Sequence, residues 1–524
     1  MTPAAAAPAV SPPPETADLA AWLAVAAGTL AAFMALLDVS IVNAALPFIQ
    51  GEIGATQSEG TWVGTSYLVA EVVIMPLTAW LERLFGLRRV LLIGAAIFTV
   101  FSVVCGMATD LTTMIVGRVG QGLAGGTLIP TGMTIMAKRL PPRQQTVGMA
   151  MFAAAALLGP IIGPLAGGWI TEFYSWHYAF FINVPICAGL ALLIIAGLPP
   201  EEGHDARLAD ADWFGVFGMM IGFGALTVLL EEGHREQWFS SALIWRLAVA
   251  GAFGFALVAV GQMRAATPVM NLALLRDRGL SSVLLLTSVM GCAMFSTIFV
   301  LPQFLAAISG YNAFQSGQVL LLMGLASLIG SVLYPAIISR IDVRIVVGCA
   351  SLLTATASYL SSNVTLETAG SDFTLPVFVL GVGIVFSAIP LQQAALSAVP
   401  VEDSGEVTSM FNIARNVGGS IGLATMASLM DGRTELHHWR LAELLGANDA
   451  DALARLDQLG AIAGGGAEGL ANGYRMLDGA IMREALVMSF GDIFLILAIA
   501  SLVVAPLVLL INPIDPERAQ GMAH

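Results

Sequence analysis

LDVSIVNAALP, residues 37–47, is an apolar run that contains a carboxylate, Asp38, and an amide, Asn43. An ionised carboxylate in hydrocarbon costs roughly 2.5–3.5 kcal/mol even on lenient insertion scales, so such a residue usually faces a polar interior and has a function there. The surrounding run, residues 20–47, is long enough to cross a bilayer. Asp38 is therefore the first candidate functional residue.

The composition of the whole chain is that of a polytopic membrane protein. Of the 524 residues, 57% are hydrophobic and 11% are charged, and the mean hydropathy is +0.83, whereas soluble domains carry about 25% charged residues. Apolar runs of about 20 residues predict an all-α protein with fourteen membrane spans. The predicted spans are 20–47, 60–81, 90–108, 111–136, 146–170, 178–198, 213–230, 241–263, 280–306, 315–339, 344–361, 373–397, 406–430 and 485–511.

Basic residues predict the orientation of these spans, because arginine and lysine stay in short cytoplasmic loops. With the N-terminus in the cytoplasm, the short outer loops hold almost nothing basic except Arg235. An even number of spans then places both termini in the cytoplasm. The basic residues of the predicted cytoplasmic loops are Arg83, Arg88, Arg89, Lys138, Arg139, Arg143, Arg207, Arg264, Arg276, Arg278, Arg340 and Arg344.

Several classes of function lack support in the sequence. The net charge of −14 argues against a nucleic-acid partner. The four cysteines are scattered singly through apolar runs, and the tandem His437-His438 lacks a set of further ligands, so we expect no metal site. No GxxxxGK[ST], HExxH or GxSxG motif indicates ATP hydrolysis or other enzyme chemistry.

Seven further strings, together with LDVSIVNAALP and the stretch from Pro76 to Arg89, resemble the drug:proton antiporters of the major facilitator superfamily, in particular the fourteen-helix multidrug exporter branch. They cover nearly the whole chain in the family's order. The strings are RVGQGLAGG (118–126), GPIIGPLAGGW (159–169), WHYAFFINVP (176–185), DWFG (212–215), EEGHREQWFSS (231–241), PVMNLALLRDR (268–278) and RNVGGSIG (415–422).

The resemblance implies a major facilitator fold of two six-helix bundles, with a helix pair inserted between them. It also implies a bacterial cytoplasmic (inner) membrane location, the proton gradient as energy source with no cofactor, and a periplasmic adaptor as a candidate partner. The expected divisions are a disordered cytoplasmic tail (1–18), a first bundle (19–200), a linker and inserted pair (201–265), a second bundle (266–511) with an outer loop (431–484), and a cytoplasmic tail (512–524).

Two further charges belong with Asp38. Glu71 lies near the middle of the second predicted span, and two acids on consecutive helices favour a shared polar cavity. At 1.5 Å per residue, Asp38 and Arg118 lie roughly 14 and 11 Å below the outer surface. The first and fourth spans are neighbours in the superfamily fold, so Arg118 is a candidate either to pair with Asp38 or to shift the pKa of Asp38. A purely structural clamp is the alternative interpretation.

We predict proton coupling by Asp38, Glu71 and Arg118, and contact with a lipophilic, often cationic substrate by six residues. The predicted function is proton-coupled efflux of drugs or toxic compounds by alternating access. The alternatives are a dedicated exporter of one endogenous metabolite or siderophore and, less favoured, a non-transporting membrane sensor. The predicted substrate residues are Asp38, Glu71, Asn43, Tyr67, Gln121 and Asn412.

Two motifs are candidates for conformational roles. The loop after the second span resembles the family's GxLaDrxG signature, but Arg83 occupies the aspartate position, one residue after Glu82, which puts in doubt the usual latch by an acid. The predicted gating residues are Glu82, Arg83, Gly86 and Arg88. The fifth span carries glycines at four-residue spacing, which indicates close helix packing; the resemblance implies a hinge face against the other bundle. The predicted hinge residues are Gly163, Pro164, Gly167 and Gly168.

Overall fold

The computed structural model describes residues 16–200, 212–265, 268–338, 340–400, 403–444 and 450–511. All the regular structure in these ranges is helical. The predicted all-α class is therefore confirmed for the described part of the chain. Most of the predicted tail 1–18, the segment 201–211 of the predicted linker and the predicted tail 512–524 lie outside the described residues.

The helices, given in chain order, include several short 3-10 turns. They are α1 (Leu19–Ile53), α2 (Gln57–Ile74), η1 (Met75–Leu77), α3 (Thr78–Phe85), α4 (Leu87–Gly106), α5 (Leu111–Arg139), α6 (Pro142–Phe173), α7 (Tyr178–Phe181), α8 (Asn183–Gly197), α9 (Trp213–Gly233), η3 (Trp238–Ser240), α10 (Ala242–Arg264), η4 (Leu272–Arg276), α11 (Arg278–Ala307), α12 (Ala313–Ile338), α13 (Val343–Ser361), η5 (Gly370–Phe373), α14 (Thr374–Ser397), α15 (Ser404–Leu444), α16 (Ala450–Ile462), α17 (Gly466–Val504) and η7 (Ala505–Leu510).

The chain is a multi-pass membrane protein. Among the described residues, eleven helices are long and apolar enough to cross a membrane. The other three predicted spans, 60–81, 111–136 and 406–430, fall on α2 to α3, α5 and α15, which carry charged residues within them. For these three helices, membrane crossing stays a prediction.

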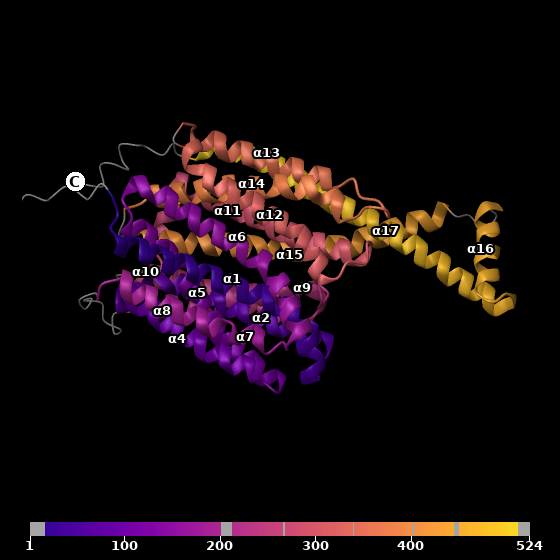
Figure 1. The fold of residues 1–524 in the computed structure, drawn as a ribbon, viewed down its shortest axis with the longest axis horizontal. Coiled ribbons are helices and arrows are strands. Elements are labelled where there is room, and N and C mark those ends of the chain that lie inside the picture. Colours follow the sequence, from indigo (N-terminus) through magenta and orange to yellow (C-terminus); the bar gives the residue numbers. More distant parts are fainter. Residues whose placement is uncertain are drawn as a thin grey trace, which may run out of the picture.

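The long helices form two bundles that lie side by side (Figure 1). Helices α1 to α8 pack mainly on one another, as do α11 to α15 with α17. The bundles meet where α6 lies along α12 and where α15 contacts η1, α3 and α5. Helices α9 and α10 pack on each other, and α9 also contacts α2 and α15. The pair α9–α10 is therefore attached to both bundles.

Two helices extend far beyond the rest of the structure (Figure 1). Helix α15 continues to Leu444 and α17 begins at Gly466, and α16 lies at their far end. The described residues of the predicted outer loop 431–484 are thus mostly helical, as its charged helical strings indicate. The helices α15 and α17 run without a break through positions 430 and 485, where the predicted spans end and begin. We call the end of the molecule that carries this extension the protruding end, and the end where α1 begins the basal end.

A glycine turn joins α3 to α4 at the basal end. Gly86 ends α3 and has φ of 80°, in the left-handed region that only glycine adopts without strain. This turn allows α4 to begin immediately at Leu87. It also fixes Arg83 in the last turn of α3, facing the second bundle.

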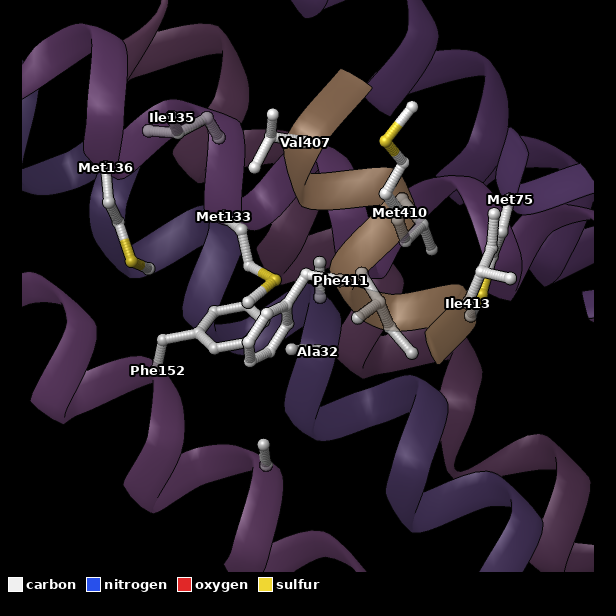
Figure 2. Packing of buried hydrophobic residues seen from close by; sticks show 14 of the residues in the cluster. Ala32, Met75, Met133, Ile135, Met136, Phe152, Val407, Met410, Phe411 and Ile413 are labelled. Carbon is white, nitrogen blue, oxygen red and sulfur yellow. The ribbon is translucent and has the colours of Figure 1, made fainter. Parts of the chain in front are cut away.

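Methionines and other flexible or apolar side chains fill the contact between α15 and the first bundle (Figure 2). Met133 of α5 and Met75 of η1 lie beside residues of α15, and all are buried. Methionine is unbranched and adapts to irregular gaps, so these side chains fill the uneven contact between the two bundles. The residues of α15 in this contact are Val407, Met410, Phe411 and Ile413.

Candidate functional site

Asp38 lies at the centre of a fully buried polar network. Arg118 Nη1 lies 2.6 Å from Asp38 Oδ2, which confirms the predicted pairing. Gln121 Nε2 and Asn183 Nδ2 donate to Asp38 Oδ1 at 3.1 and 2.6 Å. All four side chains are 0% exposed. The carboxylate therefore has one cationic and two amide donors within the protein.

Helix α2 holds a second side of the Arg118 guanidinium. Its Nε donates to the Val63 carbonyl at 3.0 Å, and its guanidinium carbon lies 4.3 Å from the centroid of the Tyr67 ring. Its Nη2 has no hydrogen-bond partner among the described residues. The ring face of a tyrosine attracts a cation, most strongly where both are desolvated. Arg118 is thus fixed by an anion, a carbonyl and an aromatic face.

The network joins four helices of the first bundle. Ser102 on α4 accepts from Gln121 of α5 at 2.7 Å and from Asn183 of α8 at 3.1 Å, while Asp38 lies on α1. Removing one partner of a buried ion pair costs roughly 3–5 kcal/mol, because the other charge stays buried. The charge of Asp38 is therefore bonded directly to α5 and α8, and through Gln121 and Asn183 to Ser102 of α4.

Sequence reasoning missed Ser102 and Asn183. Neither is charged, so neither interrupts its apolar span as Asp38 does. Asn183 does stand in the string WHYAFFINVP, where an amide near the start of a span is a weak signal. Only the spatial arrangement shows that it donates the shortest amide hydrogen bond to Asp38.

Glu71 lies outside this network. It is 4% exposed on α2, and within the described residues its carboxylate takes part in no hydrogen bond or ion pair. The cations that act on it electrostatically are Arg415 of α15 and Arg118. A buried carboxylate without a partner is costly. The carboxylate of Glu71 is therefore open to a cationic ligand, whereas that of Asp38 is already bound by three protein donors.

The part of α15 opposite Glu71 is polar and incompletely bonded. Asn412 is 0% exposed; its Nδ2 donates to Met133 Sδ at 3.0 Å and to the Thr408 carbonyl at 2.9 Å, and its Oδ1 has no partner among the described residues. The same holds for Arg415 Nε. Asn416 Nδ2 donates to the sulfur of Met75 at 3.6 Å. These groups provide hydrogen-bonding capacity where the two bundles meet.

The other predicted substrate residues fall into different surroundings. The Tyr67 hydroxyl donates to the Ala35 carbonyl at 3.4 Å, and Gln121 is held by the Asp38 network. Asn43 is exposed on α1. Asp38 itself is enclosed by protein donors. The structure thus brings Asp38, Gln121 and Tyr67 together around Arg118, and leaves Glu71 and Asn412 facing the contact between the bundles.

The predicted gating residue Arg83 forms an ion pair across the two bundles. Its Nη1 lies 2.6 Å from Glu406 Oε1 near the start of α15, and its Nη2 donates to the Val269 carbonyl at 3.3 Å. Glu406 Oε2 accepts from the Asn271 backbone at 3.0 Å. The family's acid is absent from position 83. An ion pair still connects α3 to α15, with the cation on α3 and the acid on α15. Glu406 was not predicted, because it lies 323 residues away in sequence.

The expectation that the glycine face of α6 lies against the other bundle is wrong. Side chains placed at Gly159, Gly163 and Gly167 would collide with α1, and nothing lies within 4 Å of one at Gly168. These glycines let α6 approach α1 closely, next to Asp38. Pro164 is the predicted hinge residue that does face the second bundle, near Gly317 of α12. Packing within the first bundle explains the glycine spacing.

Glu82, Gly86 and Arg88 surround Arg83 at the basal end, and their gating role stays a prediction. Glu82 is buried in α3 beside Gly405 of α15. Arg88 lies in the first turn of α4. Among the described residues no cluster of three metal-ligating side chains is present.

Comparisons with known proteins place this geometry in a family. The family model described as Major Facilitator Superfamily matches residues 28–423. The chain is 31% identical over 492 residues to "Multidrug export protein EmrB" of Escherichia coli (strain K12), covering 93% of this chain and 94% of that protein. It is 30% identical over 517 residues to "Fatty acid resistance protein FarB" of Neisseria gonorrhoeae, covering 98% and 99%. Among solved structures, the human organic anion transporter MFSD10 (TETRAN) has a similar fold, with a TM-score of 0.55, 15% identity and coverage of 92% and 99%.

Proposed function

Because the chain belongs to the Major Facilitator Superfamily, we propose that it exports lipophilic, often cationic, drugs or toxic compounds in exchange for protons by alternating access. The observation that carries this proposal is the buried ion pair of Asp38 and Arg118 at 2.6 Å. A charged pair inside a membrane protein is costly and is retained where it has a function. The relatives named as multidrug export proteins support the same substrate class.

The proposed location is the bacterial cytoplasmic membrane, with the basal end toward the cytoplasm. The basal end carries Arg83, Arg89 and Arg278, in keeping with the excess of basic residues in cytoplasmic loops. Export against a gradient without ATP needs another energy source. A membrane potential provides about 2.3 kcal/mol per charge per 100 mV, so no cofactor is needed.

The Asp38 network supplies a route from proton binding to movement. A proton on Asp38 removes the charge that pairs with Arg118, so the bound proton and the ion pair exclude each other. Arg118 keeps its charge, because a guanidinium does not lose its proton in proteins. Proton binding therefore frees Arg118 and weakens the bonds from α5 and α8 to α1. The bundles then rearrange around a neutral Asp38.

Glu71 is the proposed contact for the positive charge of a substrate. It lies where the bundles meet and has no hydrogen-bonded partner among the described residues. Arg415 and Arg118 lie near enough to act on its charge, and a bound cation would neutralise that charge at closer range. Asn412, with its unpartnered Oδ1, faces the same contact from α15. Asp38 serves as the proton site rather than as a direct substrate contact.

The Glu71→Gln variant is expected to raise the KM for the cation ethidium about tenfold or more, while a neutral lipophilic substrate is affected far less. The charge attraction is lost but the shape and the hydrogen-bonding capacity remain; a tenfold change corresponds to about 1.4 kcal/mol. Efflux is measured in proteoliposomes with each substrate. An equal loss for both substrates would show that Glu71 is a proton site or a structural residue.

The proposed function itself is tested with the purified wild-type protein in proteoliposomes. An imposed proton gradient is expected to drive ethidium against its concentration gradient, because proton entry is exchanged for substrate exit. A protonophore that collapses the gradient is expected to stop the flux. Flux that survives complete collapse of the gradient would contradict antiport, and flux only down the substrate gradient would indicate a channel.

A second candidate is a dedicated exporter of an amphipathic acid. The observation that favours it is Arg415, whose Nε has no hydrogen-bond partner among the described residues and which lies near Glu71. A guanidinium is well suited to a carboxylate. The relative named as a fatty acid resistance protein supports this alternative. Transport of a fatty acid but not of ethidium would favour it over the first proposal.

The protruding end is the proposed contact for a periplasmic adaptor. Helices α15 and α17 extend beyond the bundles and α16 lies across their far end, with exposed Trp439, Ile462 and Tyr474 on this extension. The proposal rests on this extension beyond the bundles together with large exposed side chains that a bound protein would cover.

A further inference from the structure

The turn at the protruding end of α9, residues 231–238, contacts both bundles. Helix α9 and its partner α10 lie between the bundles in sequence, and nothing so far gives this pair a function. We call residues 231–238 the α9 turn. It bonds to α2 of the first bundle and to α15 of the second, so the bundles are connected through it at this end.

The bonds to α2 are centred on a buried acid. Glu232 is 2% exposed; its Oε1 accepts from Thr65 Oγ1 at 3.2 Å, and its Oε2 lies 2.6 Å from Arg235 Nη2. Arg235 Nη1 donates to Thr61 Oγ1 at 2.6 Å. Helix α9 also packs along α2. The α9 turn is therefore firmly attached to the first bundle.

The bonds to α15 lie along one face of that helix. Ser420 Oγ donates to Glu231 Oε1 at 3.0 Å, and Trp238 Nε1 donates to Ser428 Oγ at 2.9 Å. His234 Nε2 lies 3.1 Å from Asp431 Oδ2, a pair in which Asp431 is 76% exposed. The three residues of α15 recur after two and three helical turns, so they share one face. The His234–Asp431 pair is exposed and contributes little. On the α2 side, the two residues that bond to Thr65 and Thr61, Glu232 and Arg235, are also held in place by their own ion pair within the turn. We therefore expect the bonds to α15 to break before those to α2.

Helix α15 is thus connected to the first bundle at both the basal and the protruding end of the molecule. At the basal end Glu406 pairs directly with Arg83. At the protruding end the connection runs through the α9 turn to Ser420, which is roughly 21 Å further along the axis. If the bundles rock against each other, one of these two connections breaks in each open state, because a rigid helix that tilts away at one end opens the contact there.

The structure has both connections formed at once. We propose that the α9 turn is the gate at the protruding end, and that its bonds to Ser420 and Ser428 of α15 break in the outward-open state, in which the Arg83–Glu406 pair still closes the basal end. The inserted helix pair then has a specific role: it supplies the contact that closes the protruding end, as the Arg83–Glu406 pair closes the basal end. The bonds to α15 release, while those to α2 persist. This inference rests on the proposed alternating access.

The test compares the distances between bundles at each end in the full-length protein in lipid. Spin labels are attached at Gly51→Cys and Gly432→Cys for the protruding end, and at Arg89→Cys and Arg278→Cys for the basal end. Neither glycine has an atom within 4 Å of an added Cβ, and both arginines are exposed. Cys292 and Cys349 are replaced by serine, whereas Cys105 and Cys187 are buried. Electron–electron double resonance gives the distribution of distances between the two labels at each end, and so the populations with that end open or closed.

The Ser420→Ala/Ser428→Ala double variant is expected to raise the long-distance population at the protruding end about tenfold, with no gain at the basal end. Arg83→Gln is expected to do the reverse. The Ser501 hydroxyl donates to the Leu497 carbonyl within α17 at 2.8 Å, so the control variant Ser501→Ala should change neither distribution. The single Ser420→Ala variant is measured as well, and a smaller shift in the same direction is expected from it.

Unchanged protruding-end distances in both Ser420 variants would overturn the gate, as would opening at the basal end. The same proteoliposomes are assayed for proton-driven ethidium efflux. If the wild type exports ethidium but the substitutions leave the distances between the bundles unchanged, only the gate is contradicted. A wild type without proton-driven efflux contradicts the proposed function.

Discussion

Asp38→Asn is expected to reduce proton-driven ethidium efflux to the level of liposomes without protein. The amide cannot take up the proton that must be exchanged for substrate, although it keeps an oxygen that accepts from Gln121 and Asn183. Efflux is measured in proteoliposomes with an imposed pH gradient. Asp457→Asn, on the exposed face of α16, is the matched control and should leave efflux unchanged.

The substitution also leaves Arg118 without its counterion, which costs roughly 3–5 kcal/mol when one partner of a buried pair is removed. Asp38→Asn/Arg118→Gln restores the balance of charge while still lacking a proton site. This double variant is expected to be monodisperse and inactive. Efflux at the wild-type level in either well-folded variant would show that the ion pair is a structural clamp.

Exchanging the charges of Arg83 and Glu406 is expected to rescue a transporter that the single change disables. Arg83→Glu sets two carboxylates against each other at a contact that measures 2.6 Å, so the basal end opens and efflux falls about tenfold or more. The pair is partly solvated, since Arg83 is 46% exposed, which limits the size of the effect. Adding Glu406→Arg restores the attraction and most of the efflux.

Efflux is compared for both single variants and the double variant at equal reconstituted amounts. Arg475→Gln, on an exposed part of α17, is the control for loss of an arginine. A double variant no better than the worse single variant would show that the pair does not hold the bundles together. The coupling between the two changes, rather than either loss alone, measures the interaction across the bundles.

The charges inside the spans were the part of the site that sequence reasoning predicted well. Asp38 and Arg118 stand out because each is costly in an apolar run. Their similar depth, on helices that the resemblance makes neighbours, predicts the pair. Ser102 and Asn183 are uncharged, so placing them in an apolar span costs little, and the sequence gives almost no signal for them. Likewise, nothing local connects Arg83 with Glu406, because the attraction forms only once the two bundles meet.

The glycines of α6 show a different limit. Their four-residue spacing correctly predicts one face of close packing, but spacing does not identify the helix that packs there. The resemblance to antiporters suggested the other bundle, whereas the structure places α1 against this face. The helices α15 and α17 likewise run on past the predicted span ends, because charged helix-forming residues continue them where apolar residues stop.

The measurement that tests the central proposal most directly is proton release from the purified protein on addition of ethidium, followed with a pH indicator in weak buffer. Antiport at Asp38 predicts that ethidium displaces protons from the wild-type protein, that Asp38→Asn releases none, and that Asp457→Asn behaves like the wild type. Ethidium binding without proton release from the wild type, or equal release from Asp38→Asn, would contradict it.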